Sequence, residues 1–192
     1  MKARVTALML FLWLASGPAT AQHAKRAAKA EDTGPVTVTR SATLRVTITS
    51  DAVGIFNYWS DPRKLELWFP DRAIIEPRIG GQYHFLLNGS QDMWSGVVTE
   101  FIKGNTLGLT WQPPNDPTQT NVRIKLSPQG GETNVALTHS DLTTSEALEK
   151  AVTFWTFYLQ NLKSVIELSV DKREELRKKT THATTARPKR RS

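Results

Sequence analysis

Residues 143–170 read TTSEALEKAVTFWTFYLQNLKSVIELSV, and this stretch decides the fold class. Its large apolar residues recur at alternating spacings of four and three, which predicts one long amphipathic helix. Thr143 and Glu146 form a capping-box pattern at its start. We expect the helix to run to about Val170, with or without a charged extension through Lys179. The apolar stripe consists of Leu148, Val152, Trp155, Leu159, Leu162 and Ile166.

The chain before this helix has the pattern of an antiparallel sheet. Apolar and polar residues alternate in residues 36–48, which predicts a first strand. Short β patterns then follow, separated by turn signals, and Asn88-Gly89 predicts a hairpin with a tight type I′ turn. The other turn signals are Gly80-Gly81, Gly104-Asn105, residues 113–117 and Gly130-Gly131.

Alternation along these later strands predicts one buried face and one wetter face. The long helix needs an apolar surface to cover, and the buried face supplies it. We place on that face Tyr83, Phe85, Leu87, Leu107, Leu109, Trp111, Val122, Ile124, Leu126, Val135, Leu137 and His139.

Two short helices are predicted between the first strand and the meander. Ser50 or Asp51 can cap the first, which runs through Trp59 with Val53, Phe56 and Trp59 as its candidate inward residues. Residues 60–62 (Ser-Asp-Pro) end it and start another turn or two, running to Trp68.

The first 21 residues follow the pattern of a secretory signal peptide. Lys2 and Arg4 precede an apolar run at residues 7–15, and Ala-Thr-Ala follows at residues 19–21. Nine apolar residues are too few to cross a bilayer, which takes about 20. We therefore expect cleavage before Gln22 and an exported protein, periplasmic or secreted. A buried N-terminal helix is the alternative.

Charge is distributed unevenly along the chain. The whole sequence has 25 Lys plus Arg and 18 Asp plus Glu, a net charge of +7, and it has no cysteine. Residues 172–192 alone carry nine basic and two acidic side chains, whereas residues 34–171 carry 11 basic and 14 acidic ones. We therefore expect a flexible leader at 22–35, a domain at 36–171 and a disordered basic tail at 172–192. Such a tail would bind polyanions or an anionic membrane surface without specificity, so the net charge does not indicate specific binding to nucleic acid.

The sequence offers candidates for a binding site and no recognisable catalytic motif. The missing cysteines exclude a thiol nucleophile and a thiolate metal site. No phosphate-binding loop, nucleophile elbow or acid-base carboxylate pair is recognisable, and no two histidines have zinc-ligand spacing, so we expect no metal or cofactor. His139 is either a satisfied structural histidine or a group that donates to a ligand carbonyl or acts as a base. The candidate cavity lining is Trp59, Trp68, Tyr83, Phe85, Trp94, Trp111, His139, Trp155 and Tyr158.

The segment FNYWSDPRKLELWF at residues 56–69 resembles that of the heat-shock protein 90 ATPase activator homologues. This family belongs to the START-like (SRPBCC) superfamily. Further points of resemblance, over about residues 43–168, are Gly80-Gly81 with Tyr83, then Gly96, Trp111, Thr133, His139 and Trp155. The chain departs from the family at Phe154, where the family often has glycine before its last tryptophan, and this affects how closely the helix approaches the pocket.

The resemblance implies an α+β helix-grip fold, in which a curved antiparallel sheet wraps around a long C-terminal helix and encloses a cavity. We therefore expect an exported single-domain binding protein for a small hydrophobic or lipid-like ligand. An enzyme or a protein-regulatory, chaperone-activator-like module on the same fold is the alternative.

Overall fold

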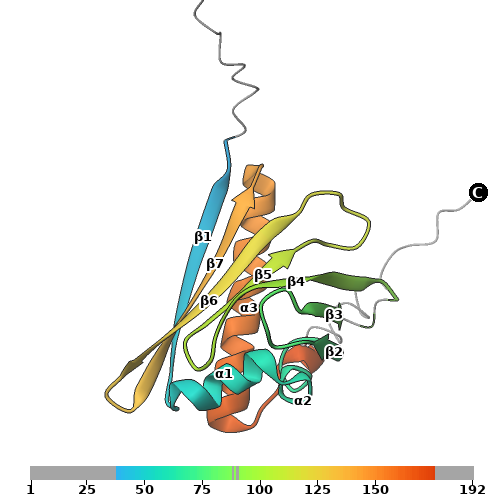
Figure 1. Cartoon of the computed structure of the whole chain (residues 1–192). Helices are drawn as coiled ribbons and strands as arrows, with labels where there is room; N and C mark the ends of the chain where they lie inside the picture. The colour runs from blue at the N-terminus through green and yellow to red at the C-terminus, as the bar shows by residue number, and fades with distance from the viewer. Residues whose placement is uncertain (1–37, 88, 90, 176–192) are drawn as a thin grey trace, which may run out of the picture. The chain divides into compact units, whose positions relative to one another are not determined.

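The structure, a computed structural model, describes residues 38–87, 89 and 91–175. Seven antiparallel strands form one curved sheet in the order β1-β7-β6-β5-β4-β3-β2, and the long helix α3 lies across one face of it (Figure 1). The strands are β1 (Arg40–Ile48), β2 (Arg72–Ile75), β3 (Gln82–Leu86), β4 (Met93–Ile102), β5 (Thr106–Trp111), β6 (Thr120–Gln129) and β7 (Glu132–Leu142). The helices are α1 (Ala52–Ser60), α2 (Pro62–Leu65) and α3 (Ser145–Leu168). This is the α+β helix-grip fold.

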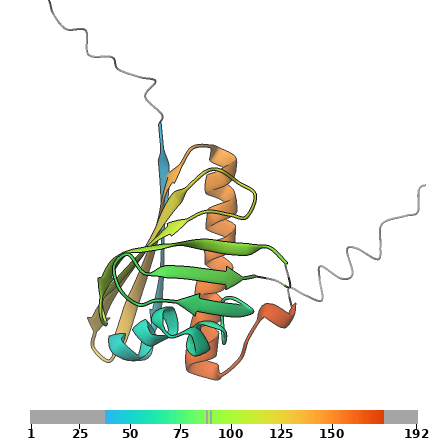
Figure 2. The same cartoon turned by 45° about the vertical axis from the view of Figure 1, so that its right-hand side comes forward.

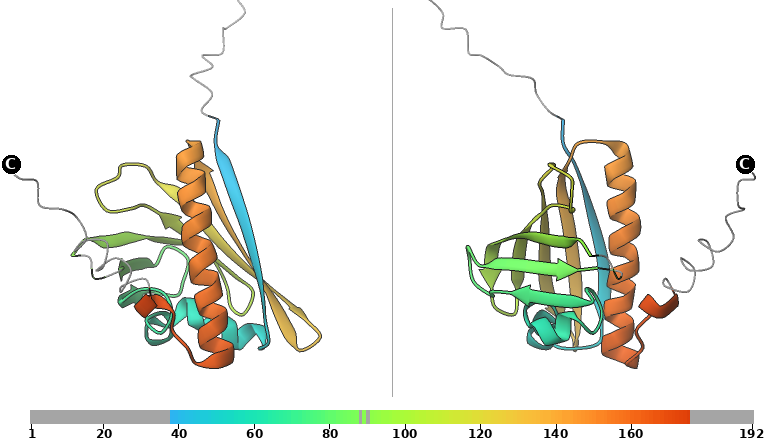
Figure 3. Two further views of the ribbon diagram at one scale, coloured as in Figure 1. Left: turned by 180° about the vertical axis from the view of Figure 1, so that it is seen from behind. Right: turned by 90° about the vertical axis from the view of Figure 1, so that its right-hand side faces the viewer.

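The predicted buried face of the sheet is confirmed. Every residue placed there, from Tyr83 to His139, is at most 5% exposed. The two views in Figure 3 show α3 running along one face of the sheet. Trp155, Leu159 and Leu162 of this helix are at most 2% exposed. The facing side chains of the helix and the sheet form the core. Each large side chain buried there stabilises the fold by about 1.5 to 3 kcal/mol.

The prediction of a tight two-residue turn at Asn88-Gly89 is wrong, because the connection between the two strands is longer. The β3–β4 ladder ends at the pair Leu86 and Met93, so residues 87–92 connect the strands. Gly89 does have the positive φ of 67° that favours glycine. The first strand begins at Arg40, and positions 36 and 37 of the predicted strand lie outside the described residues.

The two short helices share Asp61 as their junction. Asp51 caps α1 by accepting a hydrogen bond from the Gly54 amide at 2.8 Å. Asp61 ends α1 and caps α2 through the Arg63 amide at 2.9 Å. Val53, expected to face inward, is 52% exposed, because the buried stripe of α1 is Ala52, Ile55, Phe56 and Trp59. Both helices lie at the end of the sheet where α3 ends (Figure 2).

The start of α3 is shifted by one residue from the predicted capping box. Thr144, and not Thr143, is the N-cap, and its hydroxyl oxygen accepts from the Ala147 amide at 3.0 Å. Glu146 is therefore one position too early to close the box, and it pairs with Lys150 at 2.7 Å instead. Val152, assigned to the buried stripe, is 40% exposed.

The helix ends at Leu168, without the charged extension through Lys179. Ser169 takes a left-handed conformation with φ 58°, which terminates the helix. Residues 171–173 then turn back onto the domain, where Arg173 is only 7% exposed. The domain thus includes the first residues assigned to the basic tail.

Several sequence expectations lie outside the described residues: the signal peptide at 1–21, the leader at 22–35 and the tail from 176 onward. Within the described part of the chain, none of the helices has the length and apolarity that a membrane crossing requires.

Candidate functional site: an aromatic pocket at the start of the long helix

A pocket of about 430 Å³ lies where the first three turns of α3, the end of β7 and the β5–β6 connection come together. The lining residues of α3 lie in its first half. The helices α1 and α2 lie near the other end of α3 (Figure 1). The volume of the pocket is within the range of small-molecule sites, about 300 to 1,000 Å³. The lining residues are Trp94, Trp111, Pro113, Asp116, Thr118, Thr120, His139, Leu142, Thr143, Thr144, Glu146, Ala147, Lys150, Ala151, Phe154 and Trp155.

Four aromatic rings from three elements form the apolar part of the pocket. Trp94 comes from β4, Trp111 from β5, and Phe154 and Trp155 from α3. The ring centres of Trp94 and Trp111 are 5.0 Å apart, and those of Trp111 and Trp155 are 5.1 Å apart. Phe154 meets Trp155 edge to face at 5.0 Å. These contacts hold the rings in place before any ligand arrives, which lowers the entropic cost of binding.

His139 is held in a chain of hydrogen bonds beside these rings. The Trp155 indole N–H donates to Nδ1 of His139 at 3.1 Å, so Nδ1 carries no proton. The proton is therefore on Nε2, which donates to the Thr120 hydroxyl at 2.8 Å, and Thr120 donates in turn to the Trp111 carbonyl at 2.8 Å. Burial lowers the pKa of His139 from 6.5 to about 4, against a small raising effect of Asp141. The imidazole is neutral at pH 7 and both its nitrogens are engaged within the protein.

Polar side chains form the rim of the pocket. Asp116 accepts a hydrogen bond from the Thr118 amide at 2.8 Å, and this lowers the pKa of its carboxyl group. On α3, Glu146 and Lys150 form an exposed ion pair one helical turn apart. The rim residues are solvent-exposed, whereas Trp111, His139 and Trp155 are buried beneath them.

Four of the nine predicted cavity residues line this pocket: Trp94, Trp111, His139 and Trp155. The other five do not line it, because the middle of the space between sheet and helix is filled by side chains. Those five, Trp59, Trp68, Tyr83, Phe85 and Tyr158, are core residues that are at most 3% exposed.

Two of these core residues, Tyr83 and Trp68, have hydrogen-bond partners for their polar atoms, whereas the buried indole nitrogen of Trp59 has none among the described residues. The Tyr83 hydroxyl donates to the Thr110 carbonyl at 2.6 Å, and burial raises its pKa. The Trp68 indole donates to the Tyr58 carbonyl at 2.8 Å. The backbone carbonyls of Thr110 and Tyr58 thus accept these two hydrogen bonds. Tyr83 and Trp68 stabilise the fold and do not line the pocket.

Sequence reasoning missed several residues of the site. Thr120 begins the inward alternation that continues at Val122 and Ile124, so the period-two pattern already contained it. Phe154 lies four residues before Tyr158, so it is on the same side of α3 as that predicted cavity residue. Asp116 lies in a connecting loop, where no periodic signal exists, and only the tertiary structure brings it to the pocket.

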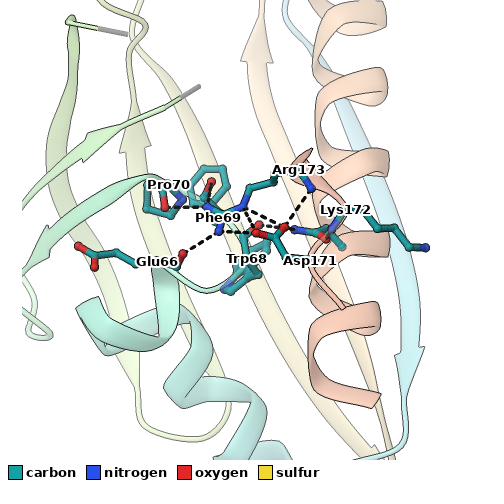
Figure 4. A network of polar contacts seen from close by, with 8 residues as sticks. Glu66, Trp68, Phe69, Pro70, Asp171, Lys172 and Arg173 are labelled. Carbon is teal, nitrogen blue, oxygen red and sulfur yellow. Dashed lines mark hydrogen bonds and ion pairs between the residues drawn. The ribbon is translucent and has the colours of Figure 1, made fainter. Parts of the chain in front are cut away.

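A second polar cluster anchors the end of the chain (Figure 4). The guanidinium of Arg173 donates to the carbonyls of Glu66 at 2.8 Å and Pro70 at 2.9 Å, and pairs with Asp171 at 2.7 Å. The buried Asn161 side-chain amide donates to the Trp68 carbonyl at 2.7 Å, and its oxygen accepts from the Lys172 amide at 2.7 Å. We call Asn161, Asp171 and Arg173 the C-terminal latch.

The described residues contain no cluster of three or more His, Cys, Asp or Glu side chains that could hold a metal ion.

A long helix gripped by a seven-stranded antiparallel sheet, with a pocket at one end, defines the START-like class of domain. The profile of the "Activator of Hsp90 ATPase homolog 1-like protein" family matches residues 51–167, and the chain belongs to this family. A search of curated proteins gave no match.

Solved structures confirm the fold. The Aha1 dimer of Colwellia psychrerythraea is 21% identical, with a TM-score of 0.59 over 67% of this chain and 97% of that one. CalU16 of Micromonospora echinospora is 22% identical, with a TM-score of 0.58 over 78% and 91% of the two chains. MLL2253 of Mesorhizobium loti is 17% identical, with a TM-score of 0.61 over 67% and 97%. At these identities the likeness shows the fold alone, and one fold can host several functions.

Proposed function

We propose that this protein binds a small, mainly apolar ligand in the aromatic pocket. The observation that carries the proposal is the pocket itself: about 430 Å³, with Trp94, Trp111, Phe154 and Trp155 as its apolar surface. A concave, mainly apolar lining with a few polar groups is the common form of small-molecule sites. Binding, not catalysis, is favoured because both nitrogens of His139 are already engaged and the imidazole has no free nitrogen for a substrate.

Two phenylalanines on α3 make a matched test of this proposal. Phe154 lines the pocket, whereas Phe157 is also half-buried on the same helix but does not line it. A panel of lipids, fatty acids and aromatic compounds is first screened by thermal shift. A ligand at about 100 times its Kd stabilises the native state by about 2.7 kcal/mol.

For any compound that binds, F154A is expected to weaken affinity roughly tenfold, equivalent to about 1.4 kcal/mol, while F157A leaves it unchanged. Equal effects of the two variants would contradict the assignment of the site, and a panel without any shift would contradict the binding function. Native mass spectrometry of the protein from its source cells then identifies the natural ligand.

We also propose that the protein is exported from the cytoplasm. Export is supported by the basic start, short apolar run and Ala-Thr-Ala of residues 1–21. The intact mass of the protein from its native compartment is expected to correspond to a chain that begins at Gln22. A mass that includes Met1 would contradict export.

A protein-regulatory role is the second candidate. The family name, with its reference to activation of the Hsp90 ATPase, favours it, as do exposed apolar side chains on the outer face of β2 and β4. Ile74 and Met93 lie there beside a shallow hollow of about 240 Å³. Export would separate the protein from a cytosolic chaperone. A failed ligand screen combined with retention of Met1 would favour this role.

A further inference from the structure

The buried part of the pocket has already paired its polar groups. The indole N–H of Trp155, both nitrogens of His139 and the hydroxyl of Thr120 bond to one another and to the Trp111 carbonyl. None of these groups is charged at neutral pH, because His139 is kept neutral. The charge of a ligand's head group must therefore be matched at the rim.

The rim carries one carboxylate without a cationic partner. Lys150 is paired with Glu146 at 2.7 Å, so these two charges offset each other. Asp116 forms no ion pair within the described part of the chain; its carboxylate accepts from the Thr118 amide. Arg40 does not line the pocket, and one of its N–H groups is directed to the Thr143 carbonyl at 3.0 Å.

The position of Asp116 is fixed by its own loop. The Gln112 side-chain amide donates to the Asp116 carbonyl at 2.7 Å, and the Asp116 amide donates to the Pro113 carbonyl at 3.3 Å. Asn115, just before it, has a φ of 63°, which turns the loop sharply. A hydrogen-bonded turn therefore holds Asp116 in the lining of the pocket.

We infer that the pocket selects ligands with a cationic amine head on an apolar body, in which the amine meets Asp116 and the body contacts the aromatic rings. This inference rests on the proposed binding function. The faces of indole and phenyl rings are negative and attract a cation within about 6 Å of the ring centre. A carboxylate head would instead face Asp116 and would have to displace Glu146 from Lys150.

Three probes with the same body separate the contributions of charge and apolar contact. The full chain is titrated at low salt with 4-phenylbutylammonium, 4-phenylbutyrate and 4-phenylbutanol, and Kd is measured by calorimetry. We expect the ammonium to bind about tenfold more tightly than the carboxylate, with the alcohol between them. D116N keeps the acceptor for Thr118, removes the charge, and should weaken ammonium binding several-fold while leaving the alcohol unchanged.

E149Q is the matched control, because Glu149 is an exposed carboxylate of α3 that does not line the pocket. It is expected to change none of the three affinities. A carboxylate that binds as tightly as the ammonium, or a D116N variant with unchanged ammonium binding, would overturn the inference while the binding function stands. Failure of all three probes, the alcohol included, would overturn both.

Discussion

His139 makes the free energy of unfolding depend on pH. Its pKa is about 4 in the folded protein and about 6.5 in the unfolded chain, so the unfolded chain takes up a proton first as pH falls. The stability that neutral His139 contributes is complete above about pH 6.5 and is lost as pH falls toward 4. The loss should reach about 3 kcal/mol, because one pKa unit corresponds to about 1.4 kcal/mol.

Urea denaturation at pH 7 and pH 4.5 measures this loss. The variant H139Q removes the titrating group and should flatten the dependence of unfolding free energy on pH in this window. H84Q, which changes a histidine on the outer face of β3, should keep it. A wild-type protein equally stable at both pH values would contradict the assignment of a buried, neutral His139.

Gly96 is the residue over which Tyr83 crosses to β5. A Cβ atom on Gly96 would lie 2.5 Å from the Thr110 hydroxyl oxygen and 2.6 Å from Cε1 of Tyr83. G96A should therefore destabilise the protein by roughly 1 to 3 kcal/mol, the usual cost of overpacking a core. S95A, at the exposed neighbouring position, should have less than half this effect. Both are measured by the urea midpoint, and equal midpoints for G96A and wild type would refute the close approach.

At the scale of elements, the C-terminal latch holds the end of α3 to the segment that follows α2. Burial alone would raise the pKa of Asp171, but hydrogen bonds from Arg173 and Asn161 outweigh it and lower the pKa. R173M would remove the ion pair and leave the Glu66 and Pro70 carbonyls without their donor. We expect a loss of about 3 kcal/mol, at the lower end of the cost of breaking a buried ion pair, because the Asp171 side chain is 31% exposed.

K172M is the control for the latch, because the Lys172 amide, and not its side chain, bonds to Asn161. Thermal unfolding of the two variants is compared with wild type. R173M should melt well below K172M, which should resemble wild type. Similar melting temperatures for both variants would contradict a structural role for the Arg173 guanidinium.

The sequence predicted elements well where a period repeats. The inward residues of the sheet and the Trp155, Leu159 and Leu162 stripe of α3 were recognisable because burial imposes a period of two on strands and about 3.6 on helices. The latch was not, because Arg173 lies in a run of charged residues that resembles a solvated tail. Its burial depends on backbone carbonyls about 100 residues earlier, which leave no local signal.

The candidate site was predicted only in part for a related reason. Alternation shows that an aromatic residue faces inward but does not show whether it meets another side chain or an empty volume. Trp111 and Tyr83 share one face, yet Trp111 lines the pocket and Tyr83 packs over Gly96. The difference depends on how α3 crosses the sheet, which is a property of the whole packing.

For the whole molecule, the basic residues beyond the domain predict a second kind of contact. Residues 180–192 include four basic side chains, whereas residues 34–171 are net acidic. Deleting residues 180–192 should lower the salt concentration at which the protein leaves a heparin column and weaken its binding to anionic vesicles. Ligand affinity of the pocket should not change. Unchanged heparin retention would refute the polyanion-binding role of the tail.

The central claim, that the aromatic pocket binds the ligand, is tested most directly by the indole N–H signals in a nitrogen–proton NMR spectrum. Residues 22–192 contain five tryptophans, of which Trp94, Trp111 and Trp155 line the pocket and Trp59 and Trp68 do not. Titration with 4-phenylbutanol should shift the signals of the first three and leave the other two in place. Unmoved signals throughout the titration, or shifts confined to Trp59 and Trp68, would contradict the account.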